Sequence, residues 1–472
     1  MMMTYEDGIN RSRFAGGSVE LILAPLALGY VLFPDPIFLL VVQTLFIGTG
    51  LIFAGLIAKH VAPDNGFVLL ASLLLYSCHT PLHFVNIFDF HAYGLLIPGA
   101  FMLIYFLLKE RWILYGFSLV YLCCVRNDLA LYSLPLCLFL LLKKKWSQAI
   151  ISFVFCVGFY IAMTDYFSPL FGEVPQHYEK YVHHRFLGQT TSGILITIVS
   201  HPIDTFLMLF SSPEKLQNML RLFWVTGFIP LIVGFEILFL ASPFFLLYFL
   251  PPSTIFTEPY HQYNASMVPF ILSAAILGMA RLGRLCSENG VVSMNVLAWL
   301  RHKFFIPIFV ISACILGYSK FNLRVDNAYR HFRKDILRKY QNHYEHYKDV
   351  DEMISYIKQK VPNEAKLGAI SYLGPHLANR EYIFLIPRQM DGLDYLLVHI
   401  FPLGNKIAPQ DEIVQQTLIT LKQRSYVVEK YLPGIILLKK VAVVSDSMRK
   451  NNLDFVEHVK SDLKQFLDKE SK

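Results

Sequence analysis

Residues 36–58 read PIFLLVVQTLFIGTGLIFAGLIA and contain no charged side chain. A helix that crosses the hydrocarbon core of a bilayer needs about 20 such residues. Further apolar stretches of similar length follow at 66–88, 91–108, 149–170, 235–250, 262–282 and 303–319. This pattern predicts a polytopic transmembrane helical bundle.

Weaker apolar stretches lie at 112–124, 127–142 and 219–233, between the clear ones. They are short for spans and fit helices that are tilted or buried within the bundle. Residues 18–34 contain Pro25 and fit either a span or a helix lying at the interface. We therefore expect about 10 or 11 spans or membrane-embedded helices.

Charge is unevenly distributed along the 472 residues, of which only 16% are charged. Soluble domains carry about 25%. Residues 1–319 hold 17 Lys and Arg with 16 Asp and Glu, whereas residues 320–472 hold 25 and 19. This split predicts a membrane region followed by a water-soluble domain. The 54% hydrophobic content excludes a disordered chain. A soluble third without cysteine excludes a disulfide scaffold.

Basic clusters lie between the predicted spans, at Lys59, Lys109 with Arg111, Lys143 to Lys145, Arg281 with Arg284, and Arg301 with Lys303. If all ten stretches from residue 36 onward are spans, every cluster falls on one side of the membrane. The positive-inside rule makes that side cytoplasmic. The net charge of +7 is explained in this way and is no indication of nucleic-acid binding.

Four segments follow from this topology: a polar N-terminal segment at 1–17, a transmembrane domain at 18–319 with an exported loop at 171–218, an extracytoplasmic α/β domain at 320–446, and an amphipathic terminal helix at 447–472. The loop pattern predicts short interfacial helices at 191–200, 203–211 and 213–222. Alternating apolar residues predict strands at 366–372, 381–386, 394–400, 425–430 and 434–439, with helices at 350–360 and 410–424.

Ionisable residues gather at the predicted extracytoplasmic ends of the spans, where they are candidate functional groups. They are Asp89, His91, Arg126, Asp128, His184, Arg185, Glu258 and His261. A carboxylate can accept the proton of an acceptor hydroxyl, and an arginine fork can hold a phosphate. This polar face above an apolar bundle suits a transferase that uses a lipid-linked phosphate donor.

Structural roles compete with these assignments. Asp89 fits a helix cap, and Arg126 with Asp128 fits an ion pair within the bundle. His79 and His83 have metal-ligand spacing, but Pro81 between them disturbs the helix. The His, Tyr and Arg side chains of the long loop also suit interfacial anchoring.

Several motifs occur in an order that resembles the DUF2079 family of predicted membrane proteins. They include Leu23-Ala24-Pro25-Leu26, Gln43-Thr44-Leu45, Phe88-Asp89-Phe90-His91, Arg126-Asn127-Asp128-Leu129, His201-Pro202, Pro213-Glu214-Lys215-Leu216, Tyr260-His261-Gln262-Tyr263, Gly374-Pro375-His376-Leu377 and Asp394-Tyr395. The resemblance covers most of residues 18–440. That family is similar to the GT-C superfamily of integral membrane glycosyltransferases.

The resemblance implies a GT-C-like bundle, a polyprenyl-phosphate sugar donor and transfer on the extracytoplasmic face. It also implies a catalytic acid in the first exported loop and a second acid at the next exported turn. Asp89 matches the second position, and Glu6 with Asp7 is the match available for the first. The sequence departs from the family pattern here, because no transmembrane helix precedes Glu6 and the loop after it is short.

Two placements of residues 1–17 fit this departure. Either they are exported, or they are cytoplasmic, with Arg11 and Arg13 following the positive-inside rule. The second placement puts Glu6 and Asp7 on the wrong side for catalysis.

The leading hypothesis is a multi-pass glycosyltransferase of the inner membrane that acts on a glycan, lipid or protein acceptor of the cell envelope. The donor is a membrane lipid, no cofactor is indicated with certainty, and a divalent metal is compatible with the carboxylates. The alternatives are a non-catalytic scaffold that keeps the architecture and, less well supported because no repeat is visible, a transporter.

Overall fold

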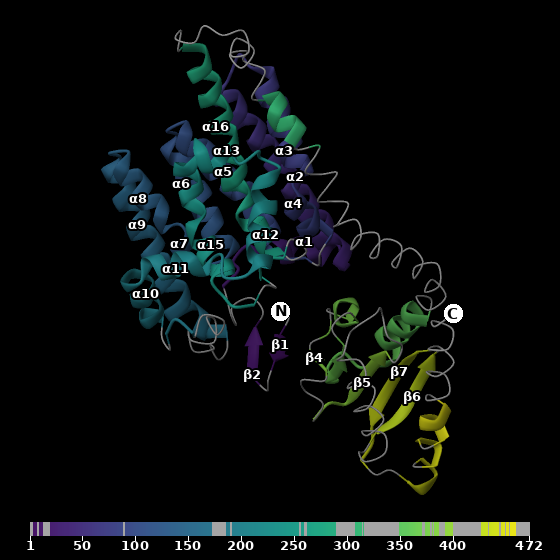
Figure 1. Ribbon diagram of the computed structural model, residues 1–472. Coiled ribbons are helices and arrows are strands. Elements are labelled where there is room, and N and C mark those ends of the chain that lie inside the picture. Colours follow the sequence, from purple (N-terminus) through teal and green to yellow (C-terminus); the bar gives the residue numbers. More distant parts are fainter. Residues whose placement is uncertain are drawn as a thin grey trace. The chain divides into compact units, whose positions relative to one another are not determined.

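A computed structural model of the chain shows two compact units (Figure 1). One contains residues 17–170 and 174–325, and the other contains residues 1–16, 171–173 and 326–472. The residues whose structure is described are 3–6, 9–12, 19–87, 90–171, 186–188, 191–253, 256–258, 262–288, 307–313, 315, 349–370, 373–377, 380, 382–386, 392–399, 426–432, 434–442, 445–448, 450–452 and 454–458. We call the first unit the bundle and the second the sheet unit.

Apolar helices form the first half of the bundle. They are α1 Leu23–Leu32, α2 Pro36–Val61, α3 Gly66–Cys78, α4 Thr80–Ile87, α5 Ala92–Leu108, α6 Trp112–Val125, α7 Leu129–Tyr132, α8 Leu134–Leu142 and α9 Trp146–Ile161. A π-helical turn, Ala162–Phe167, and a 3-10 turn, Ser168–Phe171, extend α9. α2 begins after Asp35, whose carboxylate accepts the backbone N–H of Ile37 at 2.8 Å, an N-cap of the kind that starts helices.

Shorter elements form the second half of the bundle. They are α10 Thr191–Ser200, α11 Pro202–Met208, α12 Pro213–Trp224, α13 Ile229–Ile232, α14 Phe235–Leu238, η4 Phe239–Ala241, α15 Ser242–Phe249, η6 Gln262–Ser266 and α16 Val268–Glu288. The three helices predicted in the exported loop are confirmed as α10, α11 and α12. α12 begins where Ser212 accepts the backbone N–H of Lys215 at 3.2 Å.

Two described helices are long and apolar enough to cross a bilayer, Pro36–Val61 and Trp146–Leu170. The pair Gly66–Cys78 and Thr80–Asn86 is a third crossing if its 48° bend lies within one span. The bend falls at His79, just before Pro81, as the sequence predicted. The other apolar helices of the described residues are 10–17 residues long. The total of 10 or 11 embedded helices therefore stays a prediction.

The stretch 219–233 is not one helix, and this expectation was wrong. α12 ends at Trp224, and Gly227 and Phe228 both adopt left-handed backbone, with φ of 59° and 60°. Helical backbone cannot continue through such residues. The chain remains part of the bundle here, because α13 begins at Ile229 and packs on α16.

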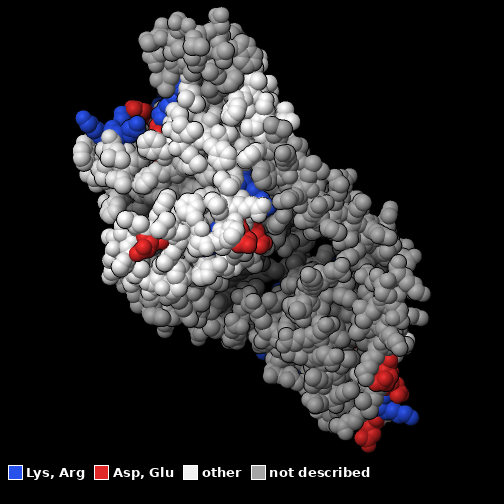
Figure 2. All heavy atoms as spheres, viewed as in Figure 1, with Lys and Arg blue, Asp and Glu red and all other residues white. Residues whose placement is uncertain are grey.

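The bundle has one basic end. His60, next to Lys59, lies 3.3 Å from the carbonyl oxygen of Leu108, next to Lys109. Lys145 pairs with Glu110 at 2.8 Å, and Arg281 pairs with Glu236. The first two contacts bring three of the predicted basic clusters together, and Glu236 also interacts electrostatically with Lys143, which adds the cluster of Arg281. Figure 2 shows Lys and Arg gathered over one end of the bundle. The positive-inside rule predicts that this basic end is cytoplasmic.

α5 ends at the basic end and α6 begins there. The start of α5 and the end of α6 therefore lie at the opposite end of the bundle, with the turns between α4 and α5 and between α6 and α7. We call this opposite end the site end. Between the two ends the outer faces are apolar: Ile37, Leu45 and Ile52 of α2 are 60–64% exposed. Since water does not favour such a belt, this surface fits lipid. Buried Leu95, Ile97 and Phe101 of α5 lie at the centre of the bundle.

The sheet unit is an α/β domain. Its strands are β1 Met3–Glu6, β2 Ile9–Ser12, β3 Leu367–Ala369, β4 Ile383–Leu385, β5 Tyr395–His399, β6 Tyr426–Leu432 and β7 Ile435–Lys440. They form one sheet in the order β2-β1-β4-β3-β5-β7-β6. β1, β4, β3 and β5 are mutually parallel where they pair, and β2, β7 and β6 are antiparallel to their neighbours. A helix at 349–360 buries Met353 and Ile357 in the same core as Leu396 and Leu437.

The five strands expected in the C-terminal region are confirmed as β3 to β7. The helix expected at 350–360 is present, and the terminal helix is helical over its described residues up to 458. The expected helix at 410–424 lies outside the described residues. The hairpin of β1 and β2 was not expected, because residues 1–17 show only weak apolar alternation.

This hairpin joins the two ends of the chain in one sheet. Thr4 pairs with Ile383 and Tyr5 pairs with Phe384. Paired strands lie about 5 Å apart, so β1 and β4 occupy the same side of a membrane. A cytoplasmic position for β1 and β2 is incompatible with an extracytoplasmic position for β4.

The same pairing constrains the number of crossings. With both ends of the bundle chain on one side, the crossings between residues 17 and 325 are even in number. α1 has 10 residues, and a helix of that length is about 15 Å long against a hydrocarbon core of about 30 Å. α1 is therefore too short to cross the bilayer by itself.

Candidate functional site

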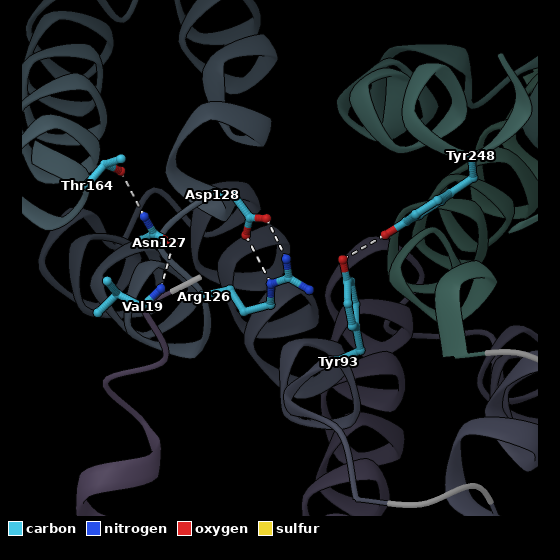
Figure 3. A network of polar contacts seen from close by, with 7 residues as sticks. All are labelled: Val19, Tyr93, Arg126, Asn127, Asp128, Thr164 and Tyr248. Carbon is cyan, nitrogen blue, oxygen red and sulfur yellow. Dashed lines mark hydrogen bonds and ion pairs between the residues drawn. The ribbon is translucent and has the colours of Figure 1, made fainter. Parts of the chain in front are cut away.

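Arg126 and Asp128 form the central ion pair of the site end. Arg126 follows the last residue of α6, and Asp128 precedes α7. The guanidinium donates from Nε to Oδ1 of Asp128 at 3.1 Å and from Nη2 to Oδ2 at 2.6 Å (Figure 3). The Asp128 side chain is 4% exposed and that of Arg126 is 18% exposed. This is a bidentate and largely buried pair, the arrangement in which arginine is most directional.

Two tyrosines extend this ion pair across the bundle. The Arg126 guanidinium lies over the ring of Tyr93, on α5, at 4.6 Å from the centroid. Tyr248, on α15, donates from its hydroxyl to the Tyr93 hydroxyl at 2.9 Å (Figure 3). A cation over an aromatic face is attracted by the ring quadrupole. Arg126 is thus oriented by a carboxylate on one side and by a hydrogen-bonded ring on another.

Asn127 connects this pair to the segment before α1. Its Oδ1 accepts the backbone N–H of Val19 at 2.9 Å, and its Nδ2 donates to Oγ1 of Thr164 at 3.0 Å. The backbone N–H of Asn127 donates to the Val19 carbonyl at 3.0 Å. Glu20, the next residue, interacts electrostatically with Arg126. A second carboxylate therefore stands near the guanidinium.

A small apolar cavity of about 20 Å³, room for about one water molecule, lies within the bundle. Its lining includes Leu122 and Leu129, which flank the Arg126–Asp128 turn in the sequence, and Tyr132. Phe244 also lines it, and the Phe244 ring is 5.4 Å from Tyr132 and 6.5 Å from Tyr248. The cavity is therefore a small apolar gap among the helices that carry the site end, and the ion pair does not line it.

The side chains of four predicted site residues are described: His91, Arg126, Asp128 and Glu258. The first three lie at the site end. Arg126 and Asp128 are paired. His91 directly precedes α5, two residues before Tyr93, and its backbone N–H donates to Oε1 of Gln43 at 2.9 Å. The backbone carbonyl of Glu258 accepts from Asn264 at 2.9 Å.

The segment of Glu258 reaches the same tyrosines. Asn264 lies in η6, as does Tyr263, whose ring lies 5.4 Å from that of Tyr248 and 5.1 Å from that of Phe256. The segment that carries Glu258 thus packs beside Tyr248.

The remaining predicted residues, Asp7, Asp89, His184, Arg185 and His261, lie outside the described residues. For Glu6 only the backbone is described, at the end of β1. Their assignments stay predictions.

His79 and His83 each contact a backbone carbonyl oxygen. The Nε2 atom of buried His79 lies 3.3 Å from the Leu222 carbonyl oxygen, and Nε2 of His83 lies 2.7 Å from the Ser77 carbonyl oxygen. Within the described part of the chain, no three His, Cys, Asp or Glu side chains gather as a metal site requires.

Sequence reasoning missed Tyr93, Tyr248 and Gln43 as members of the site end. Tyrosine and phenylalanine recur throughout the apolar stretches, so no local signal separates these two rings from packing residues. Gln43 had a usable signal, since it is the one amide within residues 36–58. A polar side chain in the middle of a span is costly unless it has partners.

Comparison with known proteins gives a match to one family model and two solved structures with some similarity. The model of the family described as predicted membrane protein DUF2079 matches residues 16–436. The structure is similar to that of ArnT from Cupriavidus metallidurans bound to undecaprenyl phosphate, with 10% identity, a TM-score of 0.49, and coverage of 92% of this chain and 89% of that one. ArnT from the same organism in the apo state gives 11% identity, a TM-score of 0.47 and the same coverage. No curated protein matches the sequence.

Proposed function

The chain belongs to the DUF2079 family of predicted membrane proteins, and from that premise we propose that it is a membrane glycosyltransferase that uses a polyprenyl-phosphate-linked sugar. The acceptor is a glycan, lipid or protein of the cell envelope, and transfer takes place on the extracytoplasmic face. The observation that carries the proposal is the largely buried arginine of the site end, in a bundle whose outer faces are apolar. A lipid phosphate needs a cation for its head and an apolar surface for its chain.

Arg126 is the residue we assign to the donor phosphate. Its guanidinium is pre-oriented by Asp128 and Tyr93, so less conformational entropy is lost when an anion binds. Asp128 also offsets the charge of Arg126 in the low-dielectric interior. An ion pair without a ligand role is the competing explanation, and the binding experiment below separates the two.

Asp89 is the acid we assign to proton removal from the acceptor hydroxyl. In the sequence it lies between Ile87, the last residue of α4, and His91, the residue before α5, and both of these lie at the site end. A carboxylate within reach of a hydroxyl acts as a general base. His91, His184, Arg185, Glu258 and His261 are assigned to the surrounding substrate contacts.

Glu6 and Asp7 are the candidates for a second acid. The pairing of β1 with β4 supports their presence on the same side as the C-terminal domain. A single reporter cysteine at position 7, in a chain without its other cysteines, tests this with an impermeant thiol reagent in intact cells. Labelling together with a control cysteine in residues 349–360 supports an exported first acid. Protection of position 7 alone contradicts it.

Binding of the donor head group is tested with the purified full-length protein in nanodiscs. The probes are a polyprenyl phosphate and the matching polyprenol, which differ only in the phosphate. We expect saturable binding of the phosphate, weakened in Arg126→Gln, and weak binding of the alcohol. Equal binding of both probes, or binding of the phosphate unaffected by Arg126→Gln, overturns the assignment of Arg126.

Transfer itself is tested with a radiolabelled sugar on the polyprenyl phosphate and membrane extracts as acceptor source. Loss of transfer in Asp89→Asn with retained donor binding is the expected result. Full transfer in Asp89→Asn contradicts the role of this acid. Donor binding without transfer by any preparation favours the non-catalytic scaffold.

A further inference from the structure

The turn between α4 and α5 is held by one side chain of α2. Gln43 is fully buried, at 0% exposure. Its Nε2 donates to the carbonyl oxygen of Val85 at 2.8 Å, and its Oε1 accepts the backbone N–H of His91 at 2.9 Å. One amide therefore ties the last turns of α4 to the first residue before α5. In the sequence, Phe88 and Asp89 lie between these two anchor points.

The neighbouring residue adds a third contact. The Thr44 hydroxyl lies 2.9 Å from Oδ1 of Asn86, one residue after Val85. α2 thus holds this turn at a backbone carbonyl, a side-chain amide and a backbone N–H. Since α2 is the longest apolar helix described here, with 26 residues, the contacts come from a rigid element.

The fit of Gln43 depends on a glycine of α5. A Cβ atom added at Gly94 would lie 2.8 Å from Cγ of Gln43 and 3.0 Å from its Oε1. Any larger residue at 94 would displace the Gln43 side chain. Because Gly94 has no side chain, the Gln43 amide can pack directly against α5 at this position.

We propose that Gln43 is a positioning residue, which fixes the end of α4 against the start of α5, the two described segments between which Asp89 lies in the sequence. Helix packing alone does not require this geometry, because an apolar residue of the same length could fill the space. A buried amide is costly unless both of its polar atoms are satisfied, and here both are used on the same turn. The inference rests on the proposed role of Asp89. The two hydrogen bonds of Gln43, which we call the clamp, can be tested without measuring any activity.

Two variants disturb the clamp from opposite sides. Gln43→Met keeps the length and removes both hydrogen bonds, whereas Gly94→Ala leaves the amide intact and pushes it away. Ser152→Ala is the matched control. Its hydroxyl forms a buried interhelical hydrogen bond with Tyr115 at 2.8 Å, toward the basic end of the bundle.

The first readout is the rate at which an impermeant thiol reagent labels Asp89→Cys in the full chain without other cysteines. Losing two hydrogen bonds raises the population of a displaced turn about 5- to 30-fold. We therefore expect a labelling rate that changes by that order in Gln43→Met and in Gly94→Ala, and that stays unchanged in Ser152→Ala. An unchanged rate in both clamp variants overturns the inference whatever the protein catalyses.

The second readout is transfer kinetics with Asp89 intact. A misplacement of about 1 Å can cost about 100-fold in rate. We expect kcat to fall by up to that factor in both clamp variants, with little change in the KM for the lipid donor. A rise in KM with unchanged kcat, or an equal loss in Ser152→Ala, contradicts a positioning role. Absence of transfer in the unmodified protein tells against the proposed function, and leaves the labelling result to decide the clamp.

Discussion

The two ends of the bundle both contain ion pairs, but the pairs differ in their surroundings. At the basic end, Lys145 and Glu110 are 35% and 57% exposed. At the site end, Arg126 and Asp128 are 18% and 4% exposed and share two hydrogen bonds. Exposed pairs contribute about 0–1 kcal/mol to stability, whereas breaking a buried pair costs about 3–5 kcal/mol.

This difference separates topology from chemistry. The charges at the basic end together determine the orientation of the protein in the membrane. We therefore expect that any one of them can be substituted with little effect. Each group at the site end has a defined partner and geometry. A residue of that kind is either an essential part of the fold or part of a binding site, and mutation can tell these apart.

The largest effect is expected from Arg126→Met. It leaves the buried Asp128 carboxylate without the guanidinium, at a cost of about 3–5 kcal/mol. The temperature at which the buried thiols of Cys123 and Cys156 become reactive measures the loss. The double variant Arg126→Met with Asp128→Leu should recover most of the stability and still fail to bind a polyprenyl phosphate. If the double variant binds the lipid normally, the pair is structural only.

Asn127→Leu is expected to come next. It removes the acceptor of the Val19 N–H and the donor to Thr164, and an unsatisfied buried group costs about 1–3 kcal/mol. Asn65→Ala is the counterpart at the basic end, where Asn65 caps α3 by accepting the N–H of Phe67 at 3.1 Å. Losing a cap costs about 1 kcal/mol. Thiol reactivity on heating compares the two, and a greater loss in Asn65→Ala would reverse the comparison.

Tyr248→Phe removes a single hydrogen bond, the one that orients Tyr93 beneath Arg126. We expect a stability loss of about 1 kcal/mol. Tyr115→Phe, which removes the bond to Ser152, should cost the same. Only Tyr248→Phe should weaken binding of a polyprenyl phosphate, by about 5-fold if that energy is expressed in the complex. Equal binding by the two variants would separate Tyr248 from the site.

Lys145→Gln is expected to have the smallest effect. Its pair with Glu110 is exposed, and such substitutions usually change stability by less than about 0.5 kcal/mol. Thermal unfolding at low and high salt measures it, and the small difference from the unmodified protein should vanish at high salt. A loss comparable to that of Arg126→Met would show that the two ends are not distinct.

Much of the architecture was predictable because it depends on local pattern. The helix at 36–58 and the strands at 395–399 and 435–440 follow from apolar runs and alternation, which act over a few residues. Arg126 and Asp128 were found as site candidates because charges stand out in apolar sequence. The break of 219–233 was missed because the left-handed residues Gly227 and Phe228 do not interrupt its hydropathy.

The β1–β2 hairpin was missed for a different reason. Residues 3–12 alternate weakly, and their pairing partner is the edge of β4, whose first residue is Ile383. The strand is stabilised by a sheet formed at the other end of the chain. No window of local sequence contains that information.

The sequence by itself determined that this is a membrane bundle with a basic end and a separate α/β region, because hydropathy and charge add up along the chain. Only the tertiary structure decided which side chains meet. The hydroxyls of Tyr93 and Tyr248 are 155 residues apart in the chain and 2.9 Å apart in space. Gln43 likewise reaches a turn more than 40 residues away. Such contacts depend on helix packing angles and on the rotation of each helix about its axis, which hydropathy leaves open.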